Sequence, residues 1–252
     1  MKQKIPHFLT MLNVLSGCIA TVFATQNQLE WAALFVFIGI FFDFIDGLAA
    51  RVLNAQSEVG IHLDSLADMI TSGLVPGIVM FQLLAMSQTG GWNAVSWQDY
   101  ELGETVTQFN SILPFLGFMI TLASAYRLAK FNTDEDQLNS FIGLPTPANA
   151  LLVMSLPLIL MYQGNDAISA LILNPWFLIG HIVLSSFLLN SNIELFALKF
   201  KDWSFKSNAL RYIFLILSLV LLLTLKFIAV PVIVALYIIS SLISRWDTKL
   251  ST

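Results

Sequence analysis

Long apolar runs, separated by little polar sequence, constrain this chain more than any other feature. Eight runs cover about 8–25, 31–53, 62–86, 110–130, 146–163, 169–190, 209–226 and 229–245. A helix needs about 20 apolar residues to cross a bilayer. Charged residues make up only 11% of the chain, whereas soluble domains carry about 25%. The sequence therefore predicts an all-α fold, a polytopic transmembrane helical bundle of about eight spans in the lipid bilayer.

The basic residues predict how this bundle is oriented. Lys and Arg accumulate in the cytoplasmic loops of membrane proteins. If the N-terminus is cytoplasmic, all of the 12 Lys and Arg residues except Lys226 fall on the cytoplasmic side. We therefore expect a multi-pass protein of the cytoplasmic membrane with both termini in the cytoplasm. The longest loop, about 87–109, is then outside.

The net charge and the cysteine content narrow the range of functions. A net charge of −4 provides no basic surface, so we expect no nucleic-acid partner. Cys18 is the only cysteine, which excludes an intramolecular disulfide and a cysteine metal site. Eight spans use roughly 160 residues, so the loops are short, and we predict a single integral-membrane domain over residues 1–252.

Four aspartates interrupt the apolar runs at neighbouring places. Asp43 and Asp46 lie near the end of the second run, and Asp64 and Asp68 lie near the start of the third. An ionisable residue inside a span costs about 2.5–3.5 kcal/mol on insertion scales, so four unpaired aspartates cost on the order of 10 kcal/mol. One or two such residues can serve helix packing, but four like charges in one place require cations.

The spacing of these aspartates predicts that they form one site. One helical stripe in the second run has positions i, i+3, i+4 and i+7, and one in the third has i, i+4 and i+8. The residues in the two stripes are Asp43, Asp46, Gly47 and Ala50, and Gly60, Asp64 and Asp68. The two helices are antiparallel across a short turn near 51–58. At 1.5 Å per residue both stripes lie about 6–12 Å below the cytoplasmic surface, so all four carboxylates can converge.

Convergent carboxylates without His or Cys favour hard cations, Mg²⁺ or Mn²⁺. Four carboxylates suit two ions that share ligands. Such a pair of ions neutralises a diphosphate and stabilises a displacement at phosphorus. Gly47 and Gly60 remove side chains from the acidic faces, so a bulky nucleotide can approach the backbone closely.

Read in order, these residues form the pattern Asp43-x2-Asp46-Gly47-x2-Ala50-Arg51-x8-Gly60-x3-Asp64-x3-Asp68. The pattern resembles, without a departure, the signature of the CDP-alcohol phosphatidyltransferase family. The resemblance implies that Asp43, Asp46 and Asp64 are metal ligands, the first and last of them bridging two ions. It implies that Asp68 is a general base and a second-metal ligand. The remaining signature residues are implied to bind CDP-diacylglycerol: Gly47, Ala50, Arg51 and Gly60.

Three further segments are similar to the bacterial CDP-diacylglycerol–serine O-phosphatidyltransferases within this family: Ile5–Gly17, Ser124–Asn132 and Phe141–Pro147. The implied reaction is attack of the L-serine hydroxyl on the β-phosphorus of CDP-diacylglycerol, which gives phosphatidylserine and CMP. The implied assembly is a homodimer. We assign the catalytic core to about 5–190 and an additional C-terminal helical hairpin to about 209–245.

Five polar residues in these segments are further candidates for the site. Arg127 and Lys130, at i and i+3 at the inner end of the fourth run, can bind phosphate or the serine carboxylate, and Asn132 follows them. Thr10 and Asn13 share one face of the first run, which in the resembling family borders the nucleotide pocket. The competing interpretations are membrane anchoring for the two cations and an interhelical hydrogen bond for Asn13.

Two alternative functions remain open at this point. The acceptor within the family could instead be glycerol 3-phosphate or inositol, but a phosphorylated acceptor needs more cationic residues than Arg51, Arg127 and Lys130 supply. A divalent-cation transporter would also keep acids inside its spans. A transporter should hold its site near the midplane of the membrane, whereas these acids lie near the inner face.

Overall fold

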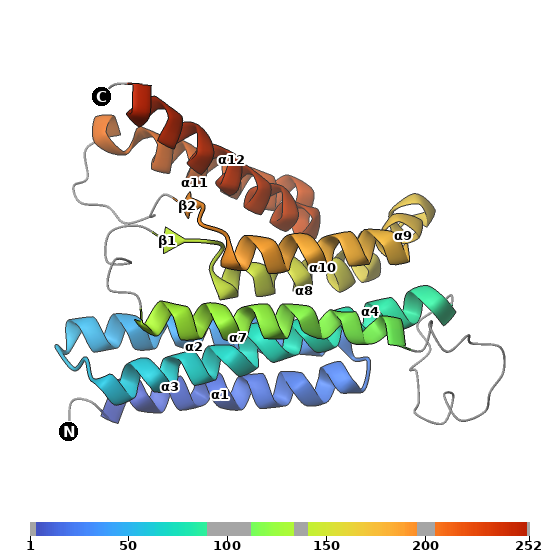
Figure 1. Ribbon diagram of the computed structural model, residues 1–252, viewed down its shortest axis with the longest axis horizontal. Coiled ribbons are helices and arrows are strands. Elements are labelled where there is room, and N and C mark those ends of the chain that lie inside the picture. Colours follow the sequence, from blue (N-terminus) through green and yellow to red (C-terminus); the bar gives the residue numbers. More distant parts are fainter. Residues whose placement is uncertain (1–3, 90–111, 134–140, 196–204, 251–252) are drawn as a thin grey trace.

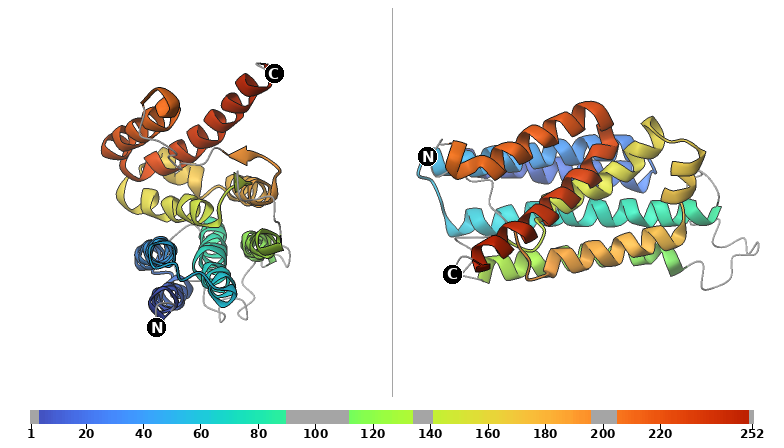
Figure 2. Two further views of the ribbon diagram at one scale, coloured as in Figure 1. Left: turned by 90° about the vertical axis from the view of Figure 1, so that its left-hand side faces the viewer. Right: turned by 90° about the horizontal axis from the view of Figure 1, so that it is seen from above.

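The computed structural model describes residues 4–89, 112–133, 141–195 and 205–250, and over these ranges the protein is a bundle of helices with one short strand pair (Figure 1). The long helices lie side by side, and α1 begins at the same end of the bundle at which α12 ends (Figures 1 and 2). The predicted all-α fold is therefore confirmed for the described residues. Nearly all of the predicted outer loop, 87–109, lies outside them.

Helices α1 (Lys4–Thr25) and α2 (Leu29–Val52) form an antiparallel hairpin that packs along its full length (Figure 1). Small side chains are buried on both helices, namely Ala20, Ala24, Ala32 and Ala33. Because lipid is as apolar as a leucine side chain, helix association in a bilayer depends on close backbone packing of this kind.

The third helical run carries a local irregularity. Helix α3 (Glu58–Asp68) begins at Ser57, whose side chain accepts a hydrogen bond from the backbone N–H of Gly60 at 3.1 Å. It continues through a π-helical turn, η1 (Met69–Leu74), into α4 (Val75–Thr89). The π-helical turn therefore begins directly after Asp68.

A second group of helices packs on the first. The 3-10 turn η2 (Leu113–Gly117) leads into α7 (Phe118–Thr133), which lies against η1 and α4. Helix α8 (Thr146–Tyr162) packs on α2, and α10 (Pro175–Asn190) packs on α7. The core between these helices is apolar, with Met80, Leu83, Met154 and Ile182 among its fully buried residues.

Short segments complete the second group. Strand β1 (Phe141–Ile142) pairs antiparallel with β2 (Glu194–Leu195), Ile142 facing Glu194. Helix α9 (Asp166–Ile172) precedes α10. Finally α11 (Phe205–Leu225), the 3-10 turn η4 (Lys226–Ile228) and α12 (Ala229–Leu250) form a V-shaped hairpin over α8 (Figure 2).

Within the described residues, four helical runs are long and apolar enough to cross a membrane. They are Lys4–Thr25, Leu29–Val52, Glu58–Gln88 and Arg211–Ile243, the last of which contains η4. A fifth is added if the bent pair α9–α10 counts as one span. The protein is therefore a multi-pass membrane protein, while the count of eight spans stays a prediction.

The predicted run 169–190 is not one continuous helix. Helices α9 and α10 are bent by 56° at the break between them. Pro175 lacks a backbone N–H and disfavours helical geometry for Asn174, the residue before it. The Asn174 side chain instead caps α10 by accepting a hydrogen bond from the backbone N–H of Trp176 at 2.9 Å.

Candidate functional site: an acidic cluster beside a buried arginine

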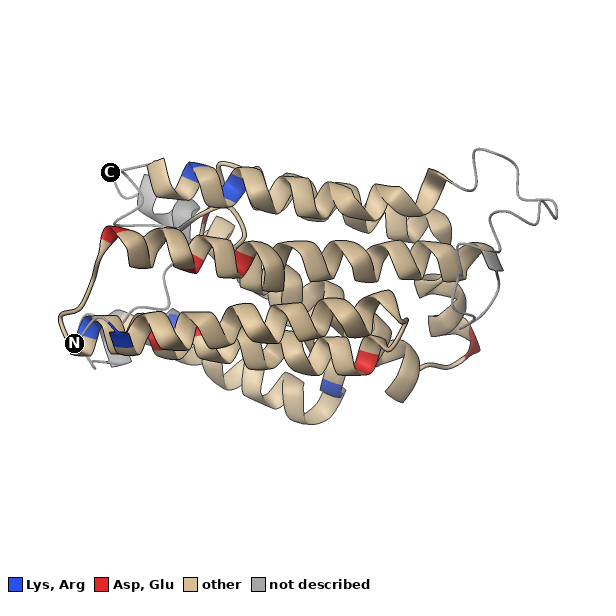
Figure 3. Cartoon of the chain, turned by 90° about the horizontal axis from the view of Figure 1, so that it is seen from below, with Lys and Arg blue, Asp and Glu red and all other residues tan. Residues whose placement is uncertain are grey.

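Three of the four predicted aspartates meet between α2 and α3. Asp43, Asp46 and Asp64 each offer a carboxylate oxygen, and these oxygens all lie within 4.8 Å of one another. They come from two helices joined by a short turn, as the spacing predicts. Acidic and basic residues both gather toward this end of the bundle (Figure 3).

Asp68 lies one helical turn beyond Asp64, and its side chain is only 8% exposed. It is close enough to Asp64 and Asp46 for their charges to interact. The predicted four-aspartate site is therefore present as three converging carboxylates with Asp68 beside them.

Two oxygens of this cluster are buried without a hydrogen-bond partner among the described residues, Asp46 Oδ2 and Asp68 Oδ1. Buried carboxylate oxygens without partners are costly unless a cation or a donor meets them. The donor set is entirely carboxylate oxygen, which is the chemistry that Mg²⁺ and Mn²⁺ prefer. The residues present therefore fit a divalent cation.

Helix α1 forms a third wall of the acidic cluster. Thr10 and Asn13 are both buried on it. The Thr10 side chain lies close to Asp46 and donates to the backbone carbonyl of Pro6 at 3.0 Å. The Asn13 side chain lies close to Asp68. Both predicted residues of the first run are thus neighbours of the acids.

The two signature glycines have different surroundings. A Cβ atom at Gly47 would meet only the Arg51 side chain, at 3.8 Å, so this face is open as predicted. A Cβ atom at Gly60 would lie 3.1 Å from Ser57 Oγ and 3.3 Å from His7 Nε2. Gly60 is therefore packed against neighbouring side chains.

Two side chains beside Gly60 were not predicted. His7 Nε2 and Ser57 Oγ form a hydrogen bond of 3.1 Å that joins α1 to the start of α3. Ser57 is identifiable from sequence as a helix N-cap, whereas His7 has no local signal. Arg51, by contrast, is exposed and donates from Nε to the backbone carbonyl of Gly47 at 2.9 Å. Ala50, one residue earlier, is half-buried.

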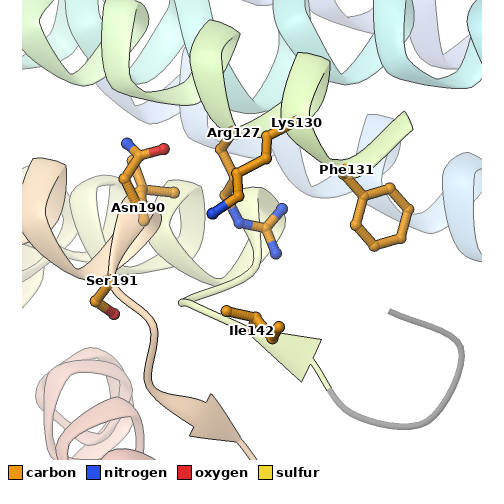
Figure 4. A pocket seen from close by; sticks show the side chains of 7 residues that line it. Arg127, Lys130, Phe131, Ile142, Asn190 and Ser191 are labelled. Atoms are coloured by element: carbon orange, nitrogen blue, oxygen red, sulfur yellow. The ribbon is translucent and has the colours of Figure 1, made fainter. Parts of the chain in front are cut away.

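Arg127 and Lys130 line a separate, narrow pocket (Figure 4). Arg127 is only 8% exposed, and its Nε has no hydrogen-bond partner among the described residues. Its guanidinium carbon lies 6.0 Å from the centre of the Phe131 ring. Both basic side chains reach from α7 toward Ile142 and the end of α10 (Figure 4).

Arg127 also connects this pocket to the acids, because its charge interacts with that of Asp68. Asn190 and Ser191, at the end of α10, complete the polar side of the pocket. Neither was a predicted site residue. The Asn190 side chain also donates from Nδ2 to the backbone carbonyl of Ala123 at 3.0 Å, a contact between segments that sequence spacing cannot reveal.

Asn132 does not line the pocket with Arg127 and Lys130. The Asn132 Nδ2 donates to Ser65 Oγ at 2.9 Å, and the Asn132 Oδ1 lies 3.2 Å from the same Ser65 Oγ. Asn132 therefore joins the end of α7 to α3, at the residue that follows Asp64.

Gly143 shapes the wall of the Arg127 pocket. It has a φ of +74°, and a Cβ atom there would lie 2.6 Å from the backbone carbonyl oxygen of Leu189. Its N–H donates to the carbonyl of Ile193 at 2.8 Å. Only glycine meets both requirements without strain, and the resulting turn holds Ile142 beside the pocket.

Comparison with known proteins agrees with this site. A model of the CDP-alcohol phosphatidyltransferase family matches residues 3–187. Three similar curated proteins are each called CDP-diacylglycerol–serine O-phosphatidyltransferase. The one from Bacillus subtilis is 33% identical over 147 residues, which cover 57% of this chain and 69% of the relative.

The second relative, from Helicobacter pylori, is 30% identical over 247 residues, which cover 96% of this chain and 90% of the relative. The third, from Saccharomyces cerevisiae, is 31% identical over 165 residues, which cover 59% of this chain and 51% of the relative. The family match includes all four aspartates and Arg127. The chain therefore belongs to the CDP-alcohol phosphatidyltransferase family.

Proposed function

We propose that this protein transfers the phosphatidyl group of CDP-diacylglycerol to the hydroxyl of L-serine and releases CMP. The observation that carries the proposal is the cluster of Asp43, Asp46 and Asp64, with Asp68 beside it. The serine-specific part is supported by the names of the similar proteins and by a buried cation next to the acids.

We assign divalent cations, Mg²⁺ or Mn²⁺ and two in number, to the acidic cluster. Asp43 and Asp64 would share both ions, Asp46 would hold one of them, and Asp68 would hold the other. Cations bound there neutralise the diphosphate of the substrate and stabilise the departing CMP. Two buried oxygens, on Asp46 and Asp68, have no hydrogen-bond partner among the residues that the structure describes, and they support this assignment.

Asp68 is the proposed general base. The serine oxygen forms a bond to the β-phosphorus, the bond from that phosphorus to the CMP oxygen breaks, and the hydroxyl proton passes to the Asp68 carboxylate. A serine hydroxyl is a weak nucleophile at neutral pH, and a positioned base typically contributes about 10²–10⁴-fold. The Asp68 Oδ1 is buried and no described residue donates a hydrogen bond to it, which supports this role.

Arg127 and Lys130 are the proposed binding residues for the serine carboxylate or a substrate phosphate. The Arg127 guanidinium is buried, its Nε has no hydrogen-bond partner within the described part of the chain, and it faces the pocket with Lys130 (Figure 4). Because Arg127 also interacts with Asp68, a small acceptor between them would have its carboxylate near the arginine and its hydroxyl near the base. Asn132, through Ser65, would position α3 and α7 around that acceptor.

The nucleotide and lipid of CDP-diacylglycerol are assigned to the α1–α2–α3 face. The proposed contacts are Thr10, Gly47, Ala50, Arg51 and Gly60. The open face at Gly47 supports close approach of the nucleotide there. Arg51, exposed at the end of α2, is the cation closest in sequence to that face.

We further propose eight spans in a cytoplasmic membrane, with the site and both termini on the cytoplasmic side. This is supported by the gathering of basic residues at the acidic end of the bundle (Figure 3). The catalytic core would be about 5–190, close to the matched residues 3–187, followed by the helical hairpin 209–245. A homodimer is the proposed assembly.

The experiment that tests this function is an acceptor panel. Purified protein in detergent receives CDP-diacylglycerol and Mg²⁺ or Mn²⁺ with one acceptor at a time: L-serine, glycerol 3-phosphate or inositol. We expect CMP release with L-serine alone and none in excess EDTA, with recovery when the metal is added back. A preference for glycerol 3-phosphate or inositol would overturn the acceptor, and turnover in EDTA would overturn the role of the metal.

The same purified protein, reconstituted into liposomes, distinguishes an enzyme from a divalent-cation transporter. In sealed liposomes an enzyme releases CMP and does not accumulate radiolabelled Mn²⁺. Metal uptake without CMP release would overturn the proposed activity.

A further inference from the structure

The side chain of Asn13 is fully buried, whereas a residue that contacts substrate can remain partly exposed. Its exposed fraction is 0%, and Nδ2 has no hydrogen-bond partner among the described residues. Oδ1 of the neighbouring Asp68 is likewise buried without one. The two side chains are neighbours on α1 and α3, so an unpartnered donor and an unpartnered acceptor belong to adjacent residues.

Thr71 determines which way the Asn13 amide faces. Its hydroxyl donates to Asn13 Oδ1 at 2.7 Å and lies 3.3 Å from the Asn13 backbone carbonyl. If the amide were turned over, Oδ1 would face the Asp68 carboxylate, and the two negative oxygens would repel. The hydroxyl and the carboxylate therefore both favour the orientation that directs Nδ2 toward Asp68.

Two glycines make room for this arrangement. A Cβ atom at Gly17 would lie 2.5 Å from Thr71 Oγ1, and one at Gly39 would lie 2.8 Å from Asn13 Oδ1. Three helical segments, α1, α2 and η1, therefore close around one hydrogen bond. Thr71 lies in the π-helical turn that starts directly after Asp68, and such turns occur frequently at functional sites.

We propose that Asn13 is a positioning residue for phosphatidyl transfer: Thr71 fixes its amide, so that Nδ2 is directed toward the Asp68 carboxylate and orients that carboxylate toward the acidic cluster. The inference rests on the proposed function of Asp68. It assigns Asn13 to the chemical step, where the family resemblance assigns it to the nucleotide pocket. It therefore predicts a loss of kcat with little change in KM for CDP-diacylglycerol.

The test uses Thr71→Val, which removes the hydroxyl without touching Asn13 or Asp68. We expect kcat with L-serine to fall about tenfold, while KM and binding of CDP-diacylglycerol stay within about twofold. Thr71→Ser restores the hydroxyl and should restore kcat. Asn13→Leu should lower kcat at least as much as Thr71→Val, with the same unchanged substrate binding.

Thr121→Val is the matched control. Thr121, on α7, donates to the backbone carbonyl of Gly73 at 3.1 Å, so the substitution removes one hydroxyl that contacts the same π-helical turn from the α7 side, away from Asn13. Thermal unfolding is measured for every variant. We expect Thr121→Val to lower Tm about as much as Thr71→Val but to keep kcat within about twofold of wild type.

Each outcome decides the inference. If Thr71→Val and Thr121→Val lose Tm equally and both keep kcat, Asn13 and Thr71 serve packing alone. If KM rises while kcat is unchanged, Asn13 belongs to the nucleotide pocket. Wild-type turnover is measured in the same assay, so a failure of the proposed function, which would abolish CMP release with L-serine in wild type, is separate from a failure of this inference.

Discussion

The acidic cluster and the Arg127 pocket lie next to each other but are built in different ways. The aspartates come from two helices joined by a short turn, and their oxygens converge within 4.8 Å. The pocket draws its walls from α7, from the Gly143 turn and from the end of α10. One site is local in sequence, whereas the other is assembled from three separate segments.

This difference also appears in how the charges are compensated. The acidic cluster concentrates negative charge, with oxygens on Asp46 and Asp68 left unpartnered among the described residues. The pocket instead contains a buried positive charge, the Arg127 guanidinium, whose Nε has no partner in the segments that the structure describes. The two are linked by the interaction of Arg127 with Asp68. The comparison supports our proposal that the acids bind cations and the diphosphate, whereas the pocket binds a small anionic group.

The largest effect should come from the centre of the acidic cluster. We expect Asp43→Asn and Asp64→Asn each to reduce CMP release by at least about 10³-fold, because each removes a charge shared by two cations. Stabilisation by Mn²⁺, measured as a shift of Tm, should be lost in parallel. A variant that keeps both the Tm shift and the turnover would show that the cations bind elsewhere.

Asp68→Asn should separate binding from chemistry at the boundary between the two regions. We expect turnover to fall by at least about 10²-fold because the base is lost. Metal-dependent binding of CDP-diacylglycerol should stay within about tenfold, or roughly 1.4 kcal/mol. Titration and CMP release are measured on one preparation. Loss of binding would make Asp68 chiefly a metal ligand, and near-normal turnover would remove it from the mechanism.

Arg127→Gln tests the pocket. We expect KM for L-serine to rise about tenfold or more, because a charge-assisted hydrogen bond is worth about 1.5–3 kcal/mol. KM for CDP-diacylglycerol should change by less than about threefold. Lys226→Gln, in the turn between α11 and α12, is a control that also removes one positive charge. Equal effects of the two substitutions would argue for a general electrostatic role rather than a binding role.

Gly143→Ala should have the smallest effect on turnover and a clear one on stability. A side chain at a φ of +74° and 2.6 Å from a carbonyl oxygen is strained, at a cost of about 1–3 kcal/mol. We expect Tm to fall and KM for L-serine to rise modestly. Gly180→Ala on α10 is the matched control, since nothing lies within 4 Å of its Cβ position. An unchanged Tm for Gly143→Ala would mean that the turn relaxes freely.

The sequence by itself determined the membrane bundle and the acidic cluster. Apolar length is sufficient to identify helices in a bilayer, since every backbone polar group must be paired within its own segment. The aspartates follow from helical periodicity on two neighbouring helices, because positions i, i+3 and i+4 share a face whatever the rest of the fold does. The family signature added the roles of these residues, which spacing alone does not provide.

Only the tertiary structure decided which distant residues meet the acids. Asn132 follows Arg127 and Lys130 in sequence but bonds to Ser65, which is 67 residues away. Asn13 pairs with Thr71 at a separation of 58 residues, through space left by glycines on two helices. Such contacts depend on the rotation and spacing of packed helices, which close backbone approach and side-chain packing determine. Periodicity gives the face of each helix, but not the partner that the face will meet.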